Sequence, residues 1–440
     1  MRGITFSLLR LFTFTPVLPH PFTSHGLTPS SRLPMTASSR WRTPTVVLVC
    51  GAVILTLALG TRQTLGLFLQ PMSADLGWGR SNYALAMALS NLVWGLAQPL
   101  FGAWADKRGA ARVVALSTLL YAAGLALMPL SSTPLMLDFS AGLLLGLGLS
   151  GVSFGVILGV IARAFPLERR SLALGIASAG GSFGQFLMLP FGQLLISSFG
   201  WKVALTALGG TVLACVPLAA AMVERGRVAS ATHAEHQSLA AALGEAGGHA
   251  GFWYLTAGFF VCGFQVAFIQ VHLPAYLLDL KLPPAVGAAA LALIGLFNVA
   301  GSFAAGYLGG RYSKKYLLSS IYLLRAAIIA LFLWLPVTPL SVYLFAGGIG
   351  FLWLGTVPLT NGLVGQIFGV RFLSTLFGIV FLSHQIGSFT GVWLGGYLFD
   401  HTGSYALVWL CAIGLGVMAA ILNLPIDERP LIRVRGQAQA

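Results

Sequence analysis

The chain has 440 residues, of which 57% are hydrophobic and only 8% are charged. Its mean hydropathy is +0.86, which excludes an ordinary soluble domain because too few polar side chains are present to cover a surface. The net charge of +14 would suit nucleic acid, but the basic residues follow membrane topology. With a cytoplasmic N-terminus, most of them fall in cytoplasmic loops and only Arg80, Lys202 and Lys281 fall outside, as the positive-inside rule requires. We predict an integral protein of a bacterial-type cytoplasmic membrane, with both termini cytoplasmic and no nucleic-acid partner.

The first 44 residues are predicted to be a cytoplasmic leader. Residues 1–34 carry Arg2, Arg10 and Arg32, several prolines and no acidic residue. A signal peptide is disfavoured because no small-residue cleavage site follows a clean apolar core. We expect residues 1–34 to be disordered, with a start at Met35 as the alternative.

Twelve apolar segments follow the leader, each near the roughly 20 residues that a helix needs to cross a bilayer. They lie at 45–70, 82–104, 112–130, 135–161, 171–196, 203–223, 252–274, 284–308, 316–336, 339–367, 373–398 and 404–424. The four cysteines, Cys50, Cys215, Cys262 and Cys411, fall inside these segments without metal-ligand spacing. We treat the cysteines as packing residues and predict neither a metal nor a cofactor.

The two halves of the chain resemble each other at an offset of about 204 residues. The stretch GAWADKRGAAR from Gly102 returns as GYLGGRYSKKY from Gly306. Such a duplication predicts two pseudo-symmetric six-helix bundles in an all-α membrane protein. The predicted parts are a leader at 1–44, bundles at 45–223 and 251–424, a cytoplasmic linker at 224–250 and a cytoplasmic tail at 425–440.

The loop after the second predicted helix carries the most specific motif. It fits Gly-x-x-x-Asp-(Arg/Lys)-x-Gly-x-(Arg/Lys)-(Arg/Lys), except at Ala111, through Gly102, Asp106, Lys107, Gly109 and Arg112. This pattern resembles the hallmark loop of the major facilitator superfamily, which implies twelve helices and transport by alternating access. We interpret the loop as a conformational latch in which Asp106 meets basic residues and a helix N-terminus. Charge that serves only topology is the alternative.

The second half repeats this loop with a different charge pattern. Gly306, Arg311 and Lys315 are retained, but Gly310 stands where the aspartate would be. The second latch is therefore expected to be weaker than the first.

Two further stretches narrow the resemblance. FPLERRSLALGIASAGGSFG from Phe165 resembles the fifth-helix signature of monocarboxylate porters. Residues 64–68 resemble a first-helix run that follows a lysine in that family; Gln63 occupies the lysine position and Arg62 precedes it. The resemblance implies a monocarboxylate as the substrate class. In place of the aspartate and arginine of the family's eighth helix, this chain has Asn298 and Ser302.

The predicted spans contain no centrally placed Asp or Glu. The ionisable residues inside the spans are therefore basic or titratable ones. These residues are Arg62, Arg325, His272 and His384. Buried ionisable groups in a membrane are functional candidates, and an arginine binds a carboxylate through two parallel hydrogen bonds. Arg62 lies about 17 residues, roughly 25 Å, into its helix, so it either binds substrate or extends to the outer interface. Arg325 is expected to bind backbone carbonyls, and the two histidines are candidate proton carriers.

Polar residues at helical spacing add candidates for a central cavity, although such stripes also serve helix packing. Segment 82–104 presents Asn91, Gly95, Gln98 and Gly102, and segment 252–274 presents Gln265, Ile269 and His272, followed by Tyr276. The predicted substrate-binding residues are Arg62, Gln63, His272, Tyr276, Asn298, Ser302, His384 and Gln385.

These observations predict a secondary active transporter for a small organic anion, with a monocarboxylate favoured and a proton as candidate co-substrate. A drug/proton antiporter of the same fold is the alternative. It is disfavoured because Ser182 lies where exporters carry Gly-Pro and because the cavity has no acid for cationic drugs. No loop offers a nucleophile with a base and no phosphate-binding Gly-Lys loop is present, so we expect neither an enzyme nor an ATP-driven pump. A monomer is expected to be the functional unit.

Overall fold

The computed structural model describes residues 41–223, 238–369 and 372–431, with a few side chains left out, among them those of Asp106 and Lys107. Most of the predicted leader and much of the predicted linker lie outside these residues. The helices are α1 (Pro44–Thr64), α2 (Leu69–Leu76), α3 (Arg80–Arg108), α4 (Ala110–Leu127), α5 (Pro134–Leu137), α6 (Leu145–Val152), α7 (Phe154–Ala164), α8 (Leu167–Leu213), α9 (Cys215–Ala219), α10 (Leu239–Gly247), α11 (Ala250–Asp279), α12 (Pro284–Gly309), α13 (Lys314–Trp334), α14 (Pro339–Leu352), α15 (Thr356–Phe368), α16 (Leu373–Thr402) and α17 (Ala406–Asn423). Short 3₁₀ turns lie at Leu65–Phe68, Met128–Leu130 and Ala220–Met222, and a π-helical turn lies at Asp138–Leu144.

Eleven helical stretches within the described residues are long and apolar enough to cross a membrane. One of them, Ala173–Met222, has 50 residues and would be about 75 Å long as a straight helix, more than twice the bilayer core. Gly200 interrupts it with φ 76° and ψ 167°, a conformation that side chains with a Cβ rarely adopt. The stretch therefore holds two crossings, and the prediction of twelve membrane helices is confirmed.

The helix ends differ from the predicted spans where polar residues extend a helix beyond its apolar part. The first span runs from Pro44 to Leu76, six residues past its predicted end. Gly77 then ends α2 in the left-handed conformation, with φ 67°. Hydropathy marks the apolar stretch, whereas the helix continues until a residue can turn the chain.

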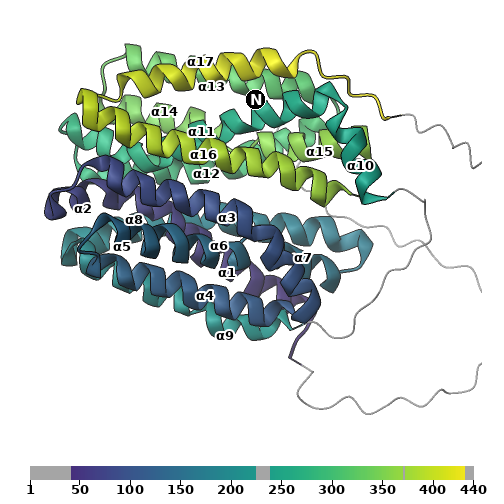
Figure 1. The fold of residues 1–440 in the computed structure, drawn as a ribbon, viewed down its shortest axis with the longest axis horizontal. Helices are drawn as coiled ribbons and strands as arrows, with labels where there is room; N and C mark the ends of the chain where they lie inside the picture. The colour runs from purple at the N-terminus through teal and green to yellow at the C-terminus, as the bar shows by residue number, and fades with distance from the viewer. Residues whose placement is uncertain (1–40, 224–237, 370–371, 432–440) are drawn as a thin grey trace, which may run out of the picture. The chain divides into compact units, whose positions relative to one another are not determined.

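The helices fall into two groups that follow the duplication in the sequence (Figure 1). Helix α1 packs along α8 in the first half, and α11 packs along α16 in the second half. Two other helix pairs, α3 with α16 and α8 with α12, join the halves. All of these helices belong to the compact unit Arg42–Ala440.

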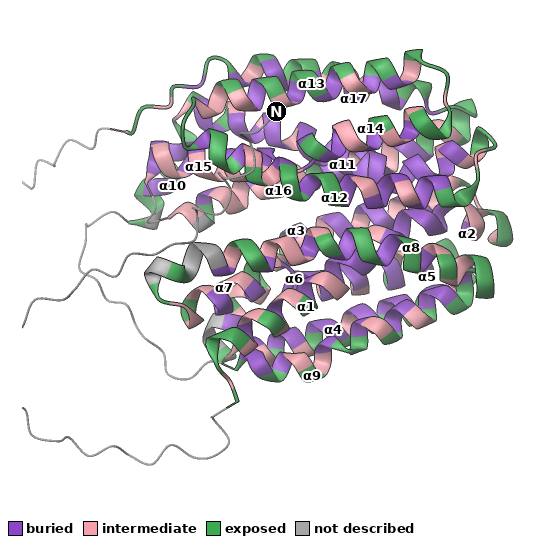
Figure 2. Cartoon of the chain, turned by 180° about the vertical axis from the view of Figure 1, so that it is seen from behind, coloured by how far each residue is buried: buried purple, intermediate pink, exposed green. Residues whose placement is uncertain are grey.

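Exposed residues lie along the outer faces of the helices (Figure 2), and many of them have large apolar side chains. Trp334, Phe303 and Leu344 are 84%, 77% and 69% exposed. An exposed apolar surface of this kind is stable against lipid. The protein is therefore an integral membrane protein, and its polar interior contacts stand out as candidate functional groups.

Candidate functional site

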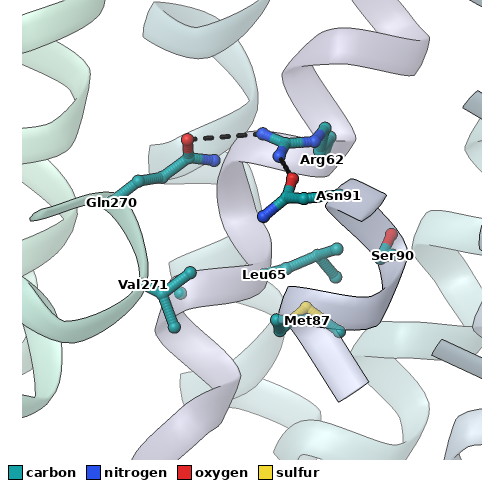
Figure 3. Close-up of a pocket in the computed structure, with 8 residues that line it drawn as sticks. Arg62, Leu65, Met87, Ser90, Asn91, Gln270 and Val271 are labelled. Atoms are coloured by element: carbon teal, nitrogen blue, oxygen red, sulfur yellow. Dashed lines mark hydrogen bonds between the residues drawn. The ribbon is translucent and has the colours of Figure 1, made fainter. Parts of the chain in front are cut away.

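Arg62 lies near the middle of the first membrane span, at a change of helix type. Helix α1 ends at Thr64, and the 3₁₀ turn at Leu65–Phe68 leads into α2. The hydroxyl of Tyr83 donates to the carbonyl of Leu65 at 2.5 Å, so this turn is fastened to α3. Two turns or more of helix separate Arg62 from either end of the span, and its side chain points into the protein (Figure 3).

The guanidinium of Arg62 lies between side chains from both halves of the chain. Its Nη1 donates to Oε1 of Gln270 on α11 at 3.4 Å, and its Nη2 donates to Oδ1 of Asn91 on α3 (Figure 3). The ring of Trp94, also on α3, lies 5.0 Å from Cζ of Arg62, within the range of a cation–π contact. None of the ion pairs formed by described residues includes Arg62.

Gly66 allows this meeting of the halves. A Cβ at Gly66 would lie 2.1 Å from the backbone oxygen of Gln270, a distance that no side chain could tolerate. The absence of a side chain brings α11 directly against the 3₁₀ turn and places Gln270 beside Arg62.

A small pocket adjoins these groups. It is lined by Arg62, Leu65, Gly66, Met87, Ser90, Asn91, Gln270 and Val271. One positive charge, neutral amides and apolar walls suit a small ligand that carries a negative charge at one end.

Two other predicted site residues are connected to Arg62 through Asn91. Nε2 of Gln385 donates to the backbone oxygen of Asn91 at 3.0 Å. Nδ1 of His384 lies 3.1 Å from Oε1 of Gln385, and the imidazole stacks on Phe381. Gln63 takes no part in this group, and its Oε1 is buried without a hydrogen-bond partner among the described residues.

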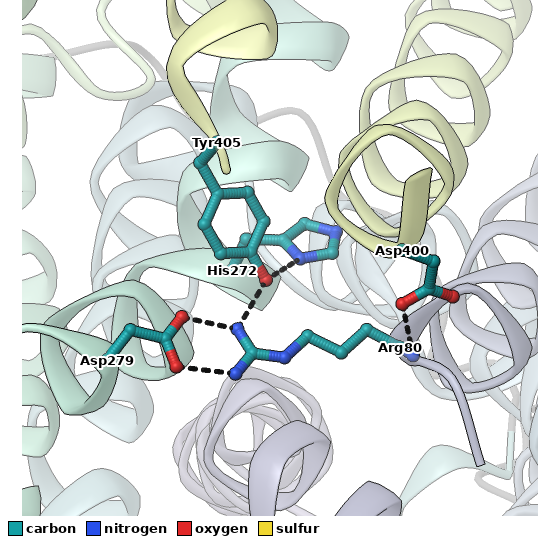
Figure 4. A network of polar contacts seen from close by, with 5 residues as sticks. All are labelled: Arg80, His272, Asp279, Asp400 and Tyr405. Atoms are coloured by element: carbon teal, nitrogen blue, oxygen red, sulfur yellow. Dashed lines mark hydrogen bonds and ion pairs between the residues drawn. The ribbon is translucent and has the colours of Figure 1, made fainter. Parts of the chain in front are cut away.

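His272 and Tyr276 lie outside the Arg62 pocket. Nε2 of His272 is 2.8 Å from the carbonyl of Val392, and Nδ1 is 3.1 Å from the hydroxyl of Tyr405. This hydroxyl also accepts from Nη1 of Arg80 at 3.0 Å (Figure 4). Burial raises the pKa of Tyr405, so the hydroxyl stays protonated and can donate to His272. Tyr276 packs edge-on against Trp409.

Asn298 and Ser302 form a third group at a break in the tenth membrane span. Helix α14 ends at Leu352 and α15 begins at Thr356. Oδ1 of Asn298 accepts from the freed backbone N–H of Leu354 at 3.0 Å and from Oγ of Ser302 at 3.0 Å. Nδ2 of Asn298 donates to Ser182 of the first half at 3.1 Å. These residues hold the break and join the halves.

Arg325 serves the same break from the other side. It is 2% exposed, and its Nε and Nη2 donate to the carbonyl of Leu352 at 3.1 and 2.7 Å. Nη2 also donates to the carbonyl of Trp353. These contacts match the role against backbone carbonyls that the sequence predicted.

The first latch loop is described only in part. Gly102 lies on α3, Gly109 links α3 to α4 with φ 96°, and Arg112 is exposed on α4. The side chains of Asp106 and Lys107 lie outside the described residues, so this latch stays a prediction.

The second latch loop receives a carboxylate from far along the chain. Oε1 of Glu428 accepts from Oγ of Ser313 at 3.0 Å and from the backbone N–H of Lys315 at 2.5 Å. Arg311 lies over the ring of Tyr307 at 4.2 Å, and a Cβ at Gly306 would meet nothing within 4 Å. A carboxylate from the predicted tail therefore contacts this loop, which has Gly310 where the first loop has its aspartate.

Sequence reasoning placed Asn91 on a cavity stripe but missed Gln270. The stripe chosen on the seventh span instead contacts α17, where Nε2 of Gln265 donates to the carbonyl of Ala412 at 2.8 Å. A polar amide within an apolar helix, as Gln270 is in α11, was the signal that could have found it.

Comparisons with known proteins agree with this architecture. A sequence profile described as the Major Facilitator Superfamily matches residues 51–371. The uncharacterized MFS-type transporter YcxA of Bacillus subtilis (strain 168) is 25% identical over 384 residues, covering 84% of this chain and 91% of that protein.

Two animal proteins and a solved structure are also similar. Monocarboxylate transporter 11 of Homo sapiens is 27% identical over 421 residues, covering 93% of this chain and 87% of its own. Monocarboxylate transporter 13 of Rattus norvegicus is 26% identical over 366 residues, covering 81% and 82%. A bacterial homolog to the human lysosomal transporter Spinster, in an inward-facing and occupied conformation, superposes with a TM-score of 0.69 at 16% identity, covering 86% of this chain and 96% of that one. This last likeness shows the fold.

Proposed function

Because the chain belongs to the Major Facilitator Superfamily, we propose that it carries a small organic anion, with a monocarboxylate as the favoured class, across the cytoplasmic membrane by alternating access. One observation carries the proposal. Arg62 lies in mid-span beside a small pocket, and its hydrogen bonds go to the neutral amides of Asn91 and Gln270. A buried cation held in this way can still gain from a carboxylate, because a charged acceptor strengthens both bonds.

The contacts between halves support alternating access about this pocket. Arg80 of the first half is bonded to Asp279 and Tyr405 of the second half at one end of the bundle (Figure 4). In mid-span, Gln385 and Asn298 reach across to the first half. We propose that the Arg80 end faces outward and is closed here, with both termini in the cytoplasm.

His384 is our candidate for proton coupling. It is half-buried and adjoins Gln385, which contacts the backbone of Asn91 beside Arg62. If its imidazole carries the proton, His384→Gln should remove the pH dependence of uptake while anion exchange continues. Unchanged pH dependence would reject this role.

The test of the function is binding and uptake by the purified, reconstituted full chain. Acetate, pyruvate and benzoate should raise the melting temperature, whereas acetamide and a cationic dye should not. Arg62→Gln should weaken anion binding roughly tenfold to a hundredfold, the worth of a hydrogen bond to a charged group. Arg62→Lys should recover only part, because a point charge cannot reproduce the fork.

Arg429→Gln is the matched control, because Arg429 is 91% exposed beside Asp427. It should leave binding unchanged. Stabilisation by the dye instead of the carboxylates would favour a drug/proton antiporter. A lower melting temperature of Arg62→Gln in the absence of ligand would show damaged packing instead of a missing charge.

A further inference from the structure

Arg62 is held by one amide from each half of the protein. Asn91 belongs to α3 of the first half and Gln270 to α11 of the second, and they are 2% and 4% exposed. We propose that Asn91 and Gln270 are positioning residues that hold the guanidinium in the empty carrier and that the substrate carboxylate takes the place of Gln270, so that anion binding breaks a contact between the halves. This inference rests on the proposed function.

The geometry explains how a carboxylate can displace Gln270. The two terminal nitrogens of Arg62 each donate to a separate amide oxygen (Figure 3), as they would to the two oxygens of one carboxylate. The bond to Gln270 is 3.4 Å long, beyond the usual range for N–H···O bonds, so it is the weaker of the two. A carboxylate adds a negative charge to these bonds and therefore competes well with a neutral oxygen.

The two acceptors have different fates when the halves move. Asn91 is in the same half as Arg62, so it moves together with the guanidinium and can keep it oriented. Gln270 is in the opposite half, so its bond to Arg62 ties the halves together at the level of the pocket. An anion that takes the place of Gln270 removes this tie, which links substrate binding to the conformational change.

Two substitutions at Gln270 should act in opposite directions on anion affinity. Gln270→Leu removes the competing acceptor, so benzoate and pyruvate should bind about three- to tenfold more tightly, the worth of an ordinary hydrogen bond, because the bond that is lost is long. Gln270→Glu supplies a permanent carboxylate, so these anions should bind at least about tenfold more weakly. A role in packing alone would not give opposite signs at one position.

The experiment is isothermal titration of the purified full chain with benzoate and pyruvate. Gln193→Glu is the matched control, because Gln193 lies on α8 and bonds to Ser197, away from the pocket; its affinities should equal those of the parent. Melting temperatures without ligand check that each variant is folded. If Gln270→Leu weakens binding, Gln270 contacts the substrate and the inference is overturned.

Unchanged affinity of Gln270→Glu for benzoate and pyruvate would also overturn the inference. Failure of the proposed function is a separate result, since the parent chain itself would then bind neither anion. If Gln270→Leu fails to fold, Gln270→Met takes its place in the titration, because methionine has an unbranched apolar side chain.

Discussion

Arg80 and Asp279, which come from different halves of the chain, form a bidentate ion pair. Nη1 and Nη2 of Arg80 donate to the two carboxylate oxygens of Asp279 at 2.7 and 2.6 Å. Asp400, also of the second half, accepts from the backbone N–H groups of Arg80 and Ser81 at 2.9 and 2.8 Å. These N–H groups begin α3 and have no partner within the helix. Two carboxylates of the second half therefore hold the first turn of α3.

Asp279→Asn should open this end of the bundle more often, because the pair loses its charge on one side. We expect a cysteine introduced at Ser90, which lines the Arg62 pocket, to react about three- to tenfold faster with a membrane-impermeant maleimide. The effect should not be larger, because the Arg80–Asp279 pair is partly solvated. Labelling of the parent chain is subtracted. Asp427→Asn, at the exposed pair with Arg429, should have no effect; unchanged labelling in Asp279→Asn would remove the gate role.

Two buried glutamines make the same contact at symmetric positions. Gln385 donates to the carbonyl of Asn91 and lies over Gly95, while Gln185 donates to the carbonyl of Leu291 at 2.9 Å and lies over Gly295. A Cβ on either glycine would lie 2.8 Å from the Cβ and Cγ of the facing glutamine.

Gly95→Ala and Gly295→Ala should each destabilise the protein by about 1–3 kcal/mol, the usual cost of overpacking. The measurement is the melting temperature in detergent. Gly210→Ala is the control, because a Cβ there would meet nothing within 4 Å. Equal melting temperatures in all three variants would mean that the glutamine contacts give way easily.

Arg325→Met should destabilise the fold without a specific effect on anion binding. The substitution leaves the carbonyls of Leu352 and Trp353 without their donor, and each unsatisfied buried group costs about 1–3 kcal/mol. We expect a lower melting temperature, with benzoate affinity close to that of the parent in the folded fraction. An unchanged melting temperature together with lost binding would place Arg325 in the substrate site.

Glu428→Ala should loosen the first turn of α13 only. Its carboxylate accepts from the backbone N–H of Lys315, as a helix-capping group does, and such caps are worth about 0.5–2 kcal/mol. Hydrogen exchange should therefore quicken roughly threefold or more at the start of α13 and not in α17. Asp427→Ala serves as the neighbouring control. Equal exchange in both variants would show that Glu428 does not cap the helix.

Hydropathy, charge placement and the internal repeat were enough to determine the membrane class and the twelve crossings, and the loop motif from Gly102 to Arg112 carried the resemblance to the family. Each of these depends on the composition of a segment and its order along the chain, and neither changes when helices pack. The turn at Gly200 illustrates this. The sequence separates two apolar spans at this point, although the helical stretch Ala173–Met222 extends through both of them. The role of Arg325 followed from the same reasoning, since a buried cation needs acceptors.

Only the tertiary structure decided which polar residues meet. Arg62 and Gln385 both form hydrogen bonds with Asn91, whereas His272 contacts Tyr405, which also bonds to Arg80. A helix presents several faces, and the sequence alone does not say which neighbour each face meets. Gln270 reaches Arg62 because Gly66, more than 200 residues earlier, lets two backbones touch. Such a contact is set by the packing of distant segments, so a local pattern could mark Gln270 as a candidate but could not name Arg62 as its partner.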